Sequence, residues 1–285
     1  MNKQEKIEIL TQNGIFHIFA IDHRDVLTVK MDEKLGKRTD DAEVLNEKLR
    51  LIGVVSNMAS AVLVDTYYFI HGKKLDEHLD MNQVLIGIER NNYDISKIGD
   101  GYLTDKISIR ELAENGCNMI KLFAYYQPDM EFTDEIDNVI GYVVDECKKY
   151  EIPLMLEPIL YRSTPETKLQ LTRDMLNRLK KFDIDIYKID FPGDLQRYSD
   201  EENCRICTEI NNLLAKPWII LSSGITLKDF EKQLKIAGNC GASGYAIGRS
   251  VWNNFILEEN LDEMERIFAE IKEVAEKYCQ KCSAR

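Results

Sequence analysis

Charged and polar side chains interrupt or directly follow the short apolar segments of this chain. In sequence order they are Asp22, Asp65, Glu89, Lys121, Glu157, Lys188, the pair Ser222/Ser223, and Arg249. A charge inside an apolar segment is costly to bury unless it is paired with another charge. Each of these residues taken alone is compatible with a purely structural ion pair. Two lysines together with several carboxylates indicate a reactive site instead.

Lys188 is the most informative of these residues, because it lies in the apolar segment 186–191 (IYKIDF). The two-residue period of a strand places Lys188 on the same face as Ile186 and Asp190. Burial and a nearby Lys121 would both lower the pKa of Lys188. The sequence therefore predicts a neutral amine, which is the form that condenses with a ketone to give a Schiff base.

Glu157 belongs to the preceding apolar segment, and we expect it on the neighbouring strand. A carboxyl group at that place can transfer protons while a carbinolamine forms and loses water. Glu157 is therefore the predicted acid/base partner of Lys188.

The last two apolar segments end in residues that suit an anion. Ser222, Ser223 and Gly224 end one segment, and Gly248 and Arg249 end the other. Glycines let backbone N–H groups approach an anion, serine adds a hydroxyl, and arginine adds a forked cation. The two ends together predict a phosphate site.

Eight apolar segments alternate with amphipathic ones, which predicts strand–helix–strand units and a parallel sheet. They are Ile15–Asp22, Ala61–Tyr68, Val84–Glu89, Met119–Tyr125, Pro153–Ile159, Ile186–Phe191, Trp218–Gly224 and Gly244–Arg249. Eight units in 285 residues favour a closed (β/α)₈ TIM barrel, whose active site forms at the carboxyl ends of the strands. A doubly wound open sheet is the second interpretation, but the turn 22–25 lacks the glycines typical of that fold.

The polar segments between the strands are expected to be helices. The clearest are Asp134–Tyr150, Glu166–Phe182, Asp200–Leu214 and Leu227–Ala237, with an extra N-terminal helix over residues 2–12 and a final helix over Leu261–Tyr278. Arg90–Thr104 has the length and glycine content of an active-site loop. We expect residues 1–285 to form a single domain.

The composition excludes several classes of function. Lys and Arg number 37 against 49 Asp and Glu, a formal net charge of −12. An acidic chain is poorly suited to nucleic acid or to anionic membranes, so we expect neither as a partner. The sequence contains no run of about 18 apolar residues, so we expect no membrane-spanning helix.

The N-terminus and the cysteines indicate a cytoplasmic protein. The first ten residues lack the apolar core of a signal peptide. Seven cysteines, an odd number, are then expected to be reduced thiols. The pairs Cys204/Cys207 and Cys279/Cys282 are interpreted as helix-face cysteines rather than as a shared metal site.

The ordered motifs resemble the class I tagatose-1,6-bisphosphate aldolase family, including its 6-deoxy-6-sulfofructose-1-phosphate aldolase branch. The resemblance extends from Phe19 to Trp252. It rests on the segments 19–24 (FAIDHR), 60–65 (SAVLVD), 120–126 (IKLFAYY), 156–159 (LEPI), 187–192 (YKIDFP), 221–224 (LSSG) and 248–252 (GRSVW).

The resemblance implies a TIM-barrel carbon–carbon lyase that cleaves a ketose phosphate to dihydroxyacetone phosphate and an aldehyde without a metal or other cofactor. Lys188 would form the Schiff base, Glu157 would be its acid/base partner, and Lys121 would support charge beside them. Asp22 would assist with the proton of the C4 hydroxyl. Ser222, Ser223, Gly224, Gly248 and Arg249 would hold the C1 phosphate.

The chain departs from the family pattern where the far end of the sugar would bind. The family's Asp-Gln-Arg is Asp22-His23-Arg24 here, and its Val-Glu-x-Pro after the lysine is residues 189–192 (IDFP). The identity of the C6 substituent therefore stays open. Candidates for binding that part of the substrate are His23, Arg24, Asp65, His71 and Arg162.

Two other functions are compatible with the sequence. One is a metal-dependent barrel lyase, although the chain has only 4 His. The other is a non-catalytic regulatory protein that binds a phosphosugar. Tagatose bisphosphate, fructose bisphosphate, a sulfosugar phosphate and a deoxysugar phosphate all remain candidate substrates, and the protein is a possible homo-oligomer.

Overall fold

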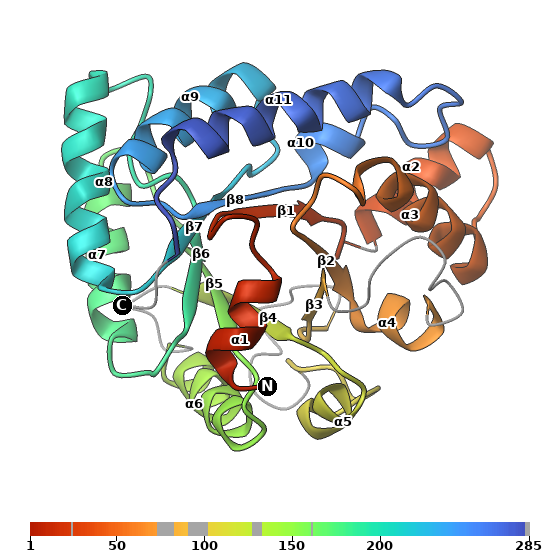
Figure 1. Ribbon diagram of the computed structural model, residues 1–285, viewed down its shortest axis with the longest axis horizontal. Coiled ribbons are helices and arrows are strands. Elements are labelled where there is room, and N and C mark those ends of the chain that lie inside the picture. Colours follow the sequence, from red (N-terminus) through yellow and green to blue (C-terminus); the bar gives the residue numbers. More distant parts are fainter. Residues whose placement is uncertain (24, 73–82, 91–101, 127–132, 161, 283–285) are drawn as a thin grey trace.

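The eight predicted strands close into one parallel barrel. The computed structural model describes residues 1–23, 25–72, 83–90, 102–126, 133–160 and 162–282. Each strand pairs with its sequence neighbours, and β1 also pairs with β8 (Figure 1). The strands are β1 (Phe16–Ala20), β2 (Ala61–Asp65), β3 (Val84–Gly87), β4 (Met119–Tyr126), β5 (Leu154–Leu160), β6 (Ile186–Ile189), β7 (Trp218–Leu221) and β8 (Gly244–Ile247). The TIM-barrel prediction is confirmed.

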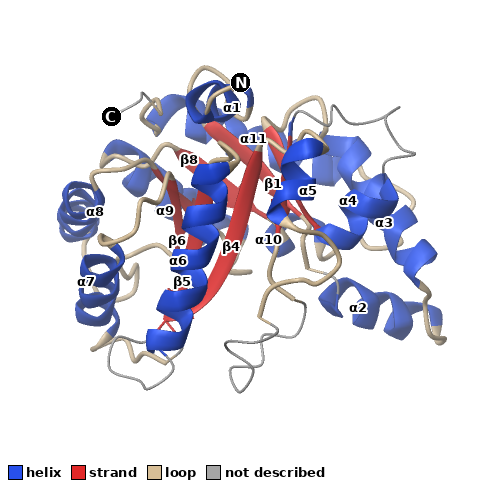
Figure 2. Ribbon diagram, turned by 90° about the horizontal axis from the view of Figure 1, so that it is seen from below, coloured by secondary structure: helices blue, strands red, loops and turns tan. Residues whose placement is uncertain are grey.

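Helices surround this barrel (Figure 2). Those that were predicted are α1 (Lys3–Ile9), α6 (Thr133–Lys149), α7 (Lys168–Leu179), α8 (Asp200–Leu214), α9 (Leu227–Asn239) and α11 (Asp262–Tyr278). The others are α2 (Asp25–Leu35), α3 (Asp41–Val55), α4 (Thr66–Gly72), α5 (Ile109–Glu114) and α10 (Arg249–Trp252). The predicted helix 2–12 is shorter at both ends, because Leu10 caps α1 and Gln12 pairs with Ile15 in a β-bridge.

Several predicted strands end before their apolar segments do, and β2 shows the reason. The apolar segment Ala61–Tyr68 leaves the strand at Asp65, and Thr66 to Tyr68 begin α4. Asp65 accepts a hydrogen bond from the backbone N–H of Tyr68 at 2.9 Å, so its carboxylate satisfies a free donor of the first helical turn. Thr66, Tyr67 and Tyr68 have residue types common in strands, but they form the first turn of α4 instead.

The strand registers decide which side chains enter the barrel. Met119, Met155 and Ile186 belong to one buried cluster in the barrel interior, whereas Tyr187 and Ile189 belong to the core between the barrel and its helices. Met155 pairs with Ile186 across β5 and β6. Two residues further along each strand, the interior face is therefore occupied by lysines 121 and 188 and by Glu157.

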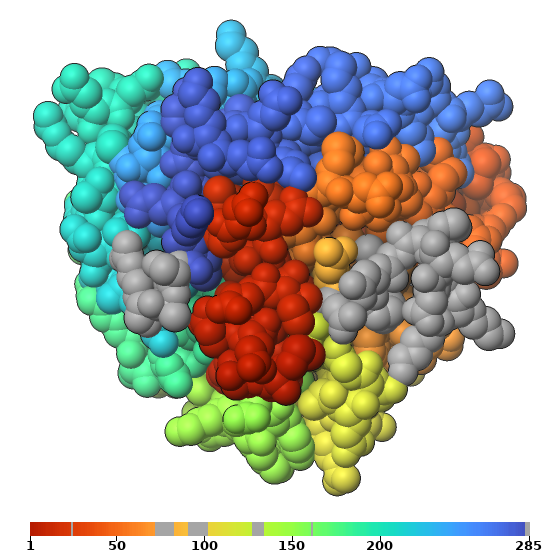
Figure 3. All heavy atoms as spheres, in the orientation of Figure 1, coloured from red at the N-terminus to blue at the C-terminus, as the bar shows by residue number. Residues whose placement is uncertain are grey.

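Helix α1 covers the end of the barrel at which the strands begin. Ile7 and Leu10 are buried in the same interior cluster as Phe16, the first residue of β1. Figure 1 shows α1 across the barrel, and Figure 3 shows the red N-terminal segment filling the middle of this face of the molecule. The catalytic candidates lie at the opposite end.

The cysteine prediction was wrong for two residues. Cys204 of α8 and Cys240, the C-cap residue of α9, form a disulfide. The structure thus pairs Cys204 with a distant cysteine and not with Cys207, which is buried as a free thiol. Cys204 and Cys207 were predicted to be free thiols on a helix face, but the packing of α8 against α9 brings Cys204 to Cys240.

The disulfide predicts how many cysteines can be alkylated before and after reduction. Alkylation of the denatured, unreduced protein should modify five cysteines, and seven after reduction, as mass spectrometry can measure. Because the bond closes a loop of 36 residues, its loss should lower the free energy of unfolding by about 3–4 kcal/mol on the chain-entropy model. Denaturant unfolding of Cys240→Ser measures this, with Cys204→Ser as the matched variant. Equal stability of reduced and oxidised protein would contradict it.

His17 is a buried histidine on the outer face of β1. Its ring meets that of Tyr245 edge-on, with centroids 5.6 Å apart. Among the described residues, neither His17 ring nitrogen has a hydrogen-bond partner, nor has the Tyr245 hydroxyl. Burial, with a smaller contribution from Lys272, lowers the pKa of His17 to about 4. The folded protein therefore holds this imidazole neutral.

This histidine should make stability depend on pH. The folded state binds fewer protons at His17 than the unfolded state, so stability falls as pH drops from about 6.5 to about 4. The expected loss between pH 7 and pH 4.5 is roughly 2 kcal/mol. Urea unfolding of wild type and His17→Phe at both pH values isolates this contribution, since other groups titrate equally in both proteins. Parallel pH curves for the two proteins would refute it.

The described residues hold no helix with both the length and the hydropathy needed to cross a bilayer.

Candidate active site

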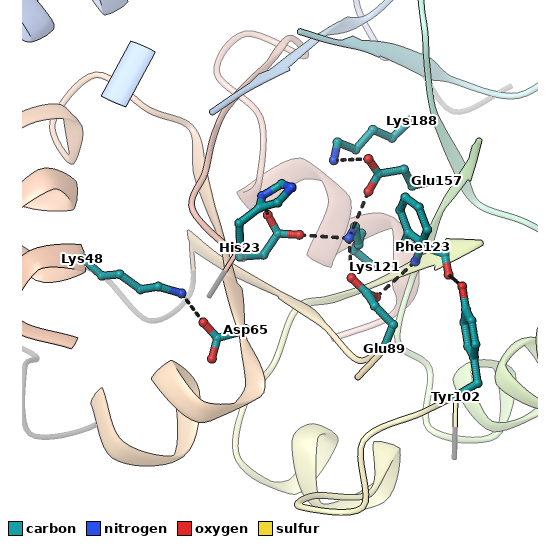
Figure 4. A network of polar contacts seen from close by, with 10 residues as sticks. His23, Lys48, Asp65, Glu89, Tyr102, Lys121, Phe123, Glu157 and Lys188 are labelled. Atoms are coloured by element: carbon teal, nitrogen blue, oxygen red, sulfur yellow. Dashed lines mark hydrogen bonds and ion pairs between the residues drawn. The ribbon is translucent and has the colours of Figure 1, made fainter. Parts of the chain in front are cut away.

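Lys121 lies at the centre of a buried charge cluster at the carboxyl end of the barrel. Its Nζ is 2.9 Å from Asp22 Oδ2, 2.5 Å from Glu89 Oε1 and 3.0 Å from Glu157 Oε2. The Lys121 side chain is only 1% exposed. Figure 4 shows Lys188, Glu157, Lys121 and Glu89 in sequence along this network. The structure thus brings together residues from four different strands or strand ends.

Lys188 reaches the cluster through Glu157. The distance from Lys188 Nζ to Glu157 Oε1 is 2.8 Å, while the other oxygen of Glu157 faces Lys121. The register explains this contact, because Leu156 pairs with Tyr187, and the next residue on each strand is Glu157 and Lys188. One carboxylate therefore lies between two ammonium groups.

The lysines keep the neighbouring carboxylates ionised. Burial alone would raise the pKa of Asp22, but the positive charge of Lys121, with smaller contributions from His23 and Lys188, outweighs it and holds the pKa well below its usual value. The pKa of Glu157 is lowered for the same reason, with Lys121 and Lys188 outweighing desolvation. At neutral pH Glu157 is a proton acceptor in contact with the amine of Lys188.

Glu89 also belongs to this cluster. It was predicted only as a carboxylate at a strand end, without a functional role. Besides contacting Lys121, it accepts a hydrogen bond from the backbone N–H of Phe123 at 3.1 Å. The carbonyl of Phe123 in turn accepts from the Tyr102 hydroxyl at 2.8 Å. Glu89 therefore fixes Lys121 from the side away from Lys188. Its position after an apolar segment was the available signal, but its partner depends on the register of β3 and β4.

A cavity of about 320 Å³ lies above these groups. Lys121, Glu157 and Lys188 line its floor and side. The five predicted phosphate-binding residues line it as well, and so does His23: Ser222, Ser223, Gly224, Gly248 and Arg249. The structure therefore gathers the two lysines, the predicted acid/base residue Glu157 and the predicted anion site around one space.

The backbone between β7 and α9 makes a tight turn in this cavity. Ser223 and Gly224 both have positive φ, 46° and 74°, and the N–H of Ile225 donates to the carbonyl of Ser222 at 3.0 Å. These values describe a turn with two left-handed central residues, which glycine favours. The Ser223 hydroxyl donates to Asp190, two residues after Lys188. Asp190 thereby orients the turn.

Gly248 has a different reason to be glycine. A Cβ built at Gly248 would lie 2.5 Å from the carbonyl oxygen of Ala20. Any side chain there would displace the end of β1 or β8. This close approach sets the position of Arg249, the next residue, at the rim of the cavity.

Three of the candidates for binding the far end of the substrate do not line this cavity. Asp65 forms a buried ion pair with Lys48, and both Asp65 and His71 line a separate cavity of about 490 Å³. Arg162 is exposed beyond the end of β5. Arg24 lies outside the described residues, as do residues 91–101 of the predicted active-site loop. No role for these residues follows from their positions.

No three His, Cys, Asp or Glu side chains in the described part of the chain are grouped to hold a metal ion.

Comparisons with known proteins identify the family of this chain. The family model described as "DeoC/LacD family aldolase" matches residues 16–254, from β1 to just beyond α10. The chain belongs to the DeoC/LacD aldolase family. As a family member it is a carbon–carbon lyase, which confirms the resemblance drawn from the sequence.

Individual members of the DeoC/LacD family are more distant. A tagatose 1,6-diphosphate aldolase of Listeria monocytogenes is 26% identical over 270 residues, covering 85% of this chain and 78% of that protein. One of Staphylococcus epidermidis is 26% identical over 285 residues, covering 89% and 86%.

Solved structures share the fold. An archaeal fructose 1,6-bisphosphate aldolase is 17% identical with a TM-score of 0.68, covering 95% of this chain and all of that one. A Schiff-base-forming fructose-1,6-bisphosphate aldolase is 18% identical with a TM-score of 0.67 and the same coverage.

Proposed function

We propose that this aldolase is a class I enzyme that cleaves a ketose 1-phosphate or bisphosphate to dihydroxyacetone phosphate and an aldehyde, through a Schiff base on Lys188. The observation that carries the proposal is the contact of 2.8 Å between Lys188 and Glu157 inside the cavity that the predicted phosphate-binding residues also line. A reactive amine, a proton acceptor and an anion site around one space suit this reaction.

The proposed reaction begins with a proton transfer. Lys188 passes a proton to Glu157, and the free amine attacks the C2 ketone. As Lys188 loses its charge, one of the two cations that lower the pKa of Glu157 is removed. Glu157 then retains the proton until it is needed to expel the C2 hydroxyl as water.

The resulting iminium draws electrons from the C3–C4 bond. That bond breaks when the C4 hydroxyl loses its proton, which gives an aldehyde and an enamine on Lys188. Protonation at C3 and addition of water release dihydroxyacetone phosphate. Lys121, fixed by Asp22 and Glu89, supplies a constant positive charge beside these steps.

The C1 phosphate is proposed to bind at the turn Ser222–Gly224 and at Arg249. Replacing Arg249 by glutamine should raise KM for the ketose phosphate by roughly 10- to 100-fold, because a charge-assisted contact to phosphate contributes about 1.5–3 kcal/mol. The value of kcat should change much less. Initial-rate kinetics check this, with Arg205→Gln on the exposed surface of α8 as control. An unchanged KM would place the phosphate elsewhere.

The Schiff base can be tested directly. Borohydride added with dihydroxyacetone phosphate should leave a covalent adduct, and peptide mapping should locate it at Lys188. An unchanged mass, or an adduct on another lysine, would overturn the assignment.

The aldehyde half of the substrate is tested by a panel. Tagatose 1,6-bisphosphate is the first candidate, because the curated relatives bear that name. Fructose 1,6-bisphosphate, a sulfofructose phosphate and a 6-deoxyketose phosphate complete the panel, with dihydroxyacetone phosphate as the product detected. Binding of these compounds without turnover would favour a regulatory role for this chain.

A further inference from the structure

We infer that His23 is a catalytic residue of this aldolase: it takes the proton of the C4 hydroxyl when the C3–C4 bond breaks, and Asp22 acts through it. The inference rests on the proposed function. It changes the role implied for both residues, since Asp22 was expected to act on the substrate directly and His23 only to bind it.

The cavity exposes the histidine and not the aspartate. His23 lines the cavity together with Lys188, whereas Asp22 does not. The side chain of Asp22 is 4% exposed against 27% for His23. One Asp22 oxygen faces Lys121 at 2.9 Å, and the other lies 3.3 Å from Nδ1 of His23. A substrate in the cavity therefore meets the imidazole first.

Asp22 is suited to support a base that becomes charged. The pKa of Asp22 stays well below its usual value, mainly because Lys121 outweighs the effect of burial. The aspartate is thus ionised at every pH at which an imidazole titrates. An ionised carboxylate beside Nδ1 keeps the N–H on that nitrogen, leaves Nε2 as the acceptor, and stabilises the imidazolium that forms.

Glu157, which also lines the cavity, is already engaged in two ion pairs. Glu157 contacts both Lys121 and Lys188 and is proposed to serve the C2 oxygen. The charged groups that share the cavity with His23, or lie directly behind it, are Asp22, Lys121, Glu157, Lys188, Asp190 and Arg249. Glu157 and Asp190, the two carboxylates among the described residues that line the cavity, already contact Lys188 and Ser223. An imidazole is a base of the strength that suits this step.

In the proposed step, one proton moves to His23 and electron pairs shift within the covalent intermediate. Nε2 of His23 binds the proton of the C4 hydroxyl, and the O–H electron pair becomes the second bond of the aldehyde C=O. The C3–C4 electron pair moves to form C2=C3, and the iminium nitrogen of Lys188 becomes neutral in the enamine. His23 leaves the step as an imidazolium beside Asp22 and returns its proton to water before the next turnover.

The experiment separates cleavage from Schiff-base chemistry. Dihydroxyacetone phosphate alone should exchange a C3 hydrogen with D₂O through the enamine, a reaction that involves no C4 hydroxyl. In His23→Gln we expect this exchange to stay within about threefold of wild type. Cleavage of tagatose 1,6-bisphosphate, or of the panel member that wild type cleaves fastest, should fall about 100-fold, a typical effect of losing a general base.

Two further readouts identify a base rather than a structural residue. If His23 is the base, the pH profile of wild-type cleavage should have an acid limb that disappears in His23→Gln. Added imidazole should restore part of the activity of His23→Ala. His71→Gln, which changes a histidine in the other cavity, is the matched control and should leave the pH profile unchanged.

Each outcome has one meaning. Unchanged cleavage in His23→Gln would overturn the inference, and so would exchange that falls in parallel with cleavage, because that result means lost structure. A wild-type protein that neither exchanges dihydroxyacetone phosphate nor cleaves any member of the panel would instead overturn the proposed function.

Discussion

Replacing Lys188 by methionine should reduce cleavage by on the order of 10⁵-fold or more, because Lys188 is the residue proposed to form the covalent intermediate. The borohydride adduct with dihydroxyacetone phosphate should disappear in the same variant. Steady-state kinetics and intact-protein mass spectrometry measure the two effects. Since methionine is close to lysine in length, the barrel interior should remain filled.

Lys188→Arg is the matched control for charge. Arginine keeps the positive charge beside Glu157 but stays protonated, so it cannot form an imine at neutral pH. We expect it to be as inactive as Lys188→Met and more stable than it. Residual activity above one per cent in either variant would show that the reaction does not pass through Lys188.

Lys121→Met should have the largest effect on stability. The change leaves Asp22, Glu89 and Glu157 buried together without their shared cation. Breaking a buried ion pair by removing one partner typically costs about 3–5 kcal/mol, and three carboxylates depend on this one. Denaturant unfolding at pH 7 measures the loss. Lys216→Met, which removes an exposed pair with Asp183, should cost less than about 1 kcal/mol.

The stability deficit of Lys121→Met should depend on pH. The folded-state pKa values of Asp22 and Glu157 are lowered, so their contribution is present above their unfolded values and is lost as pH falls through the folded values. The deficit relative to wild type should therefore be greatest near neutral pH and should shrink below about pH 4. A deficit that is the same at pH 7 and pH 3.5 would mean that lost packing, not lost charge pairing, explains it.

The alternating pattern of the strands was sufficient to predict much of the site. The strand period placed Lys188 on the same face as Ile186, and in the structure Ile186 lies in the barrel interior. Glu157 was predicted on the neighbouring strand, and there it lies two residues after Met155, which also faces inward. The glycine, serine and arginine residues at the ends of the last two apolar segments predicted the phosphate site, and the fold places them around the same cavity. Local periodicity decides which face a side chain occupies, so these positions could be read from the sequence.

Contacts between residues far apart in the sequence could not be predicted from local periodicity. Glu89 was visible as a strand-end carboxylate, but only the closed barrel brings it against Lys121. Asp65 had the same signature, yet its partner is Lys48 on α3, which the sequence pattern did not single out. Cys204 bonds to Cys240, 36 residues away, through the packing of two helices. Chain topology, and not the local sequence, determines all three partners.

The net negative charge of the chain is compatible with a site that binds an anion. Lys121, Lys188 and Arg249 line one cavity as expected, but Asp22, Glu89 and Glu157 neutralise most of the charge on its floor. The uncompensated positive charge of the described cavity lies toward Arg249, where the phosphate is proposed to bind. A net charge of −12 is therefore compatible with binding a small anion at one rim.

The helix α1 across the far end of the barrel has a kinetic consequence. Because Ile7 and Leu10 fill that end, substrate, water and both products of the proposed reaction are expected to pass through the cavity at the carboxyl ends of the strands. The aldehyde is held by no bond after cleavage, whereas the three-carbon fragment is still attached to Lys188. The aldehyde must vacate the cavity before water can reach the attached fragment. Product-inhibition kinetics should accordingly show ordered release, with dihydroxyacetone phosphate competitive against the ketose substrate and the aldehyde noncompetitive.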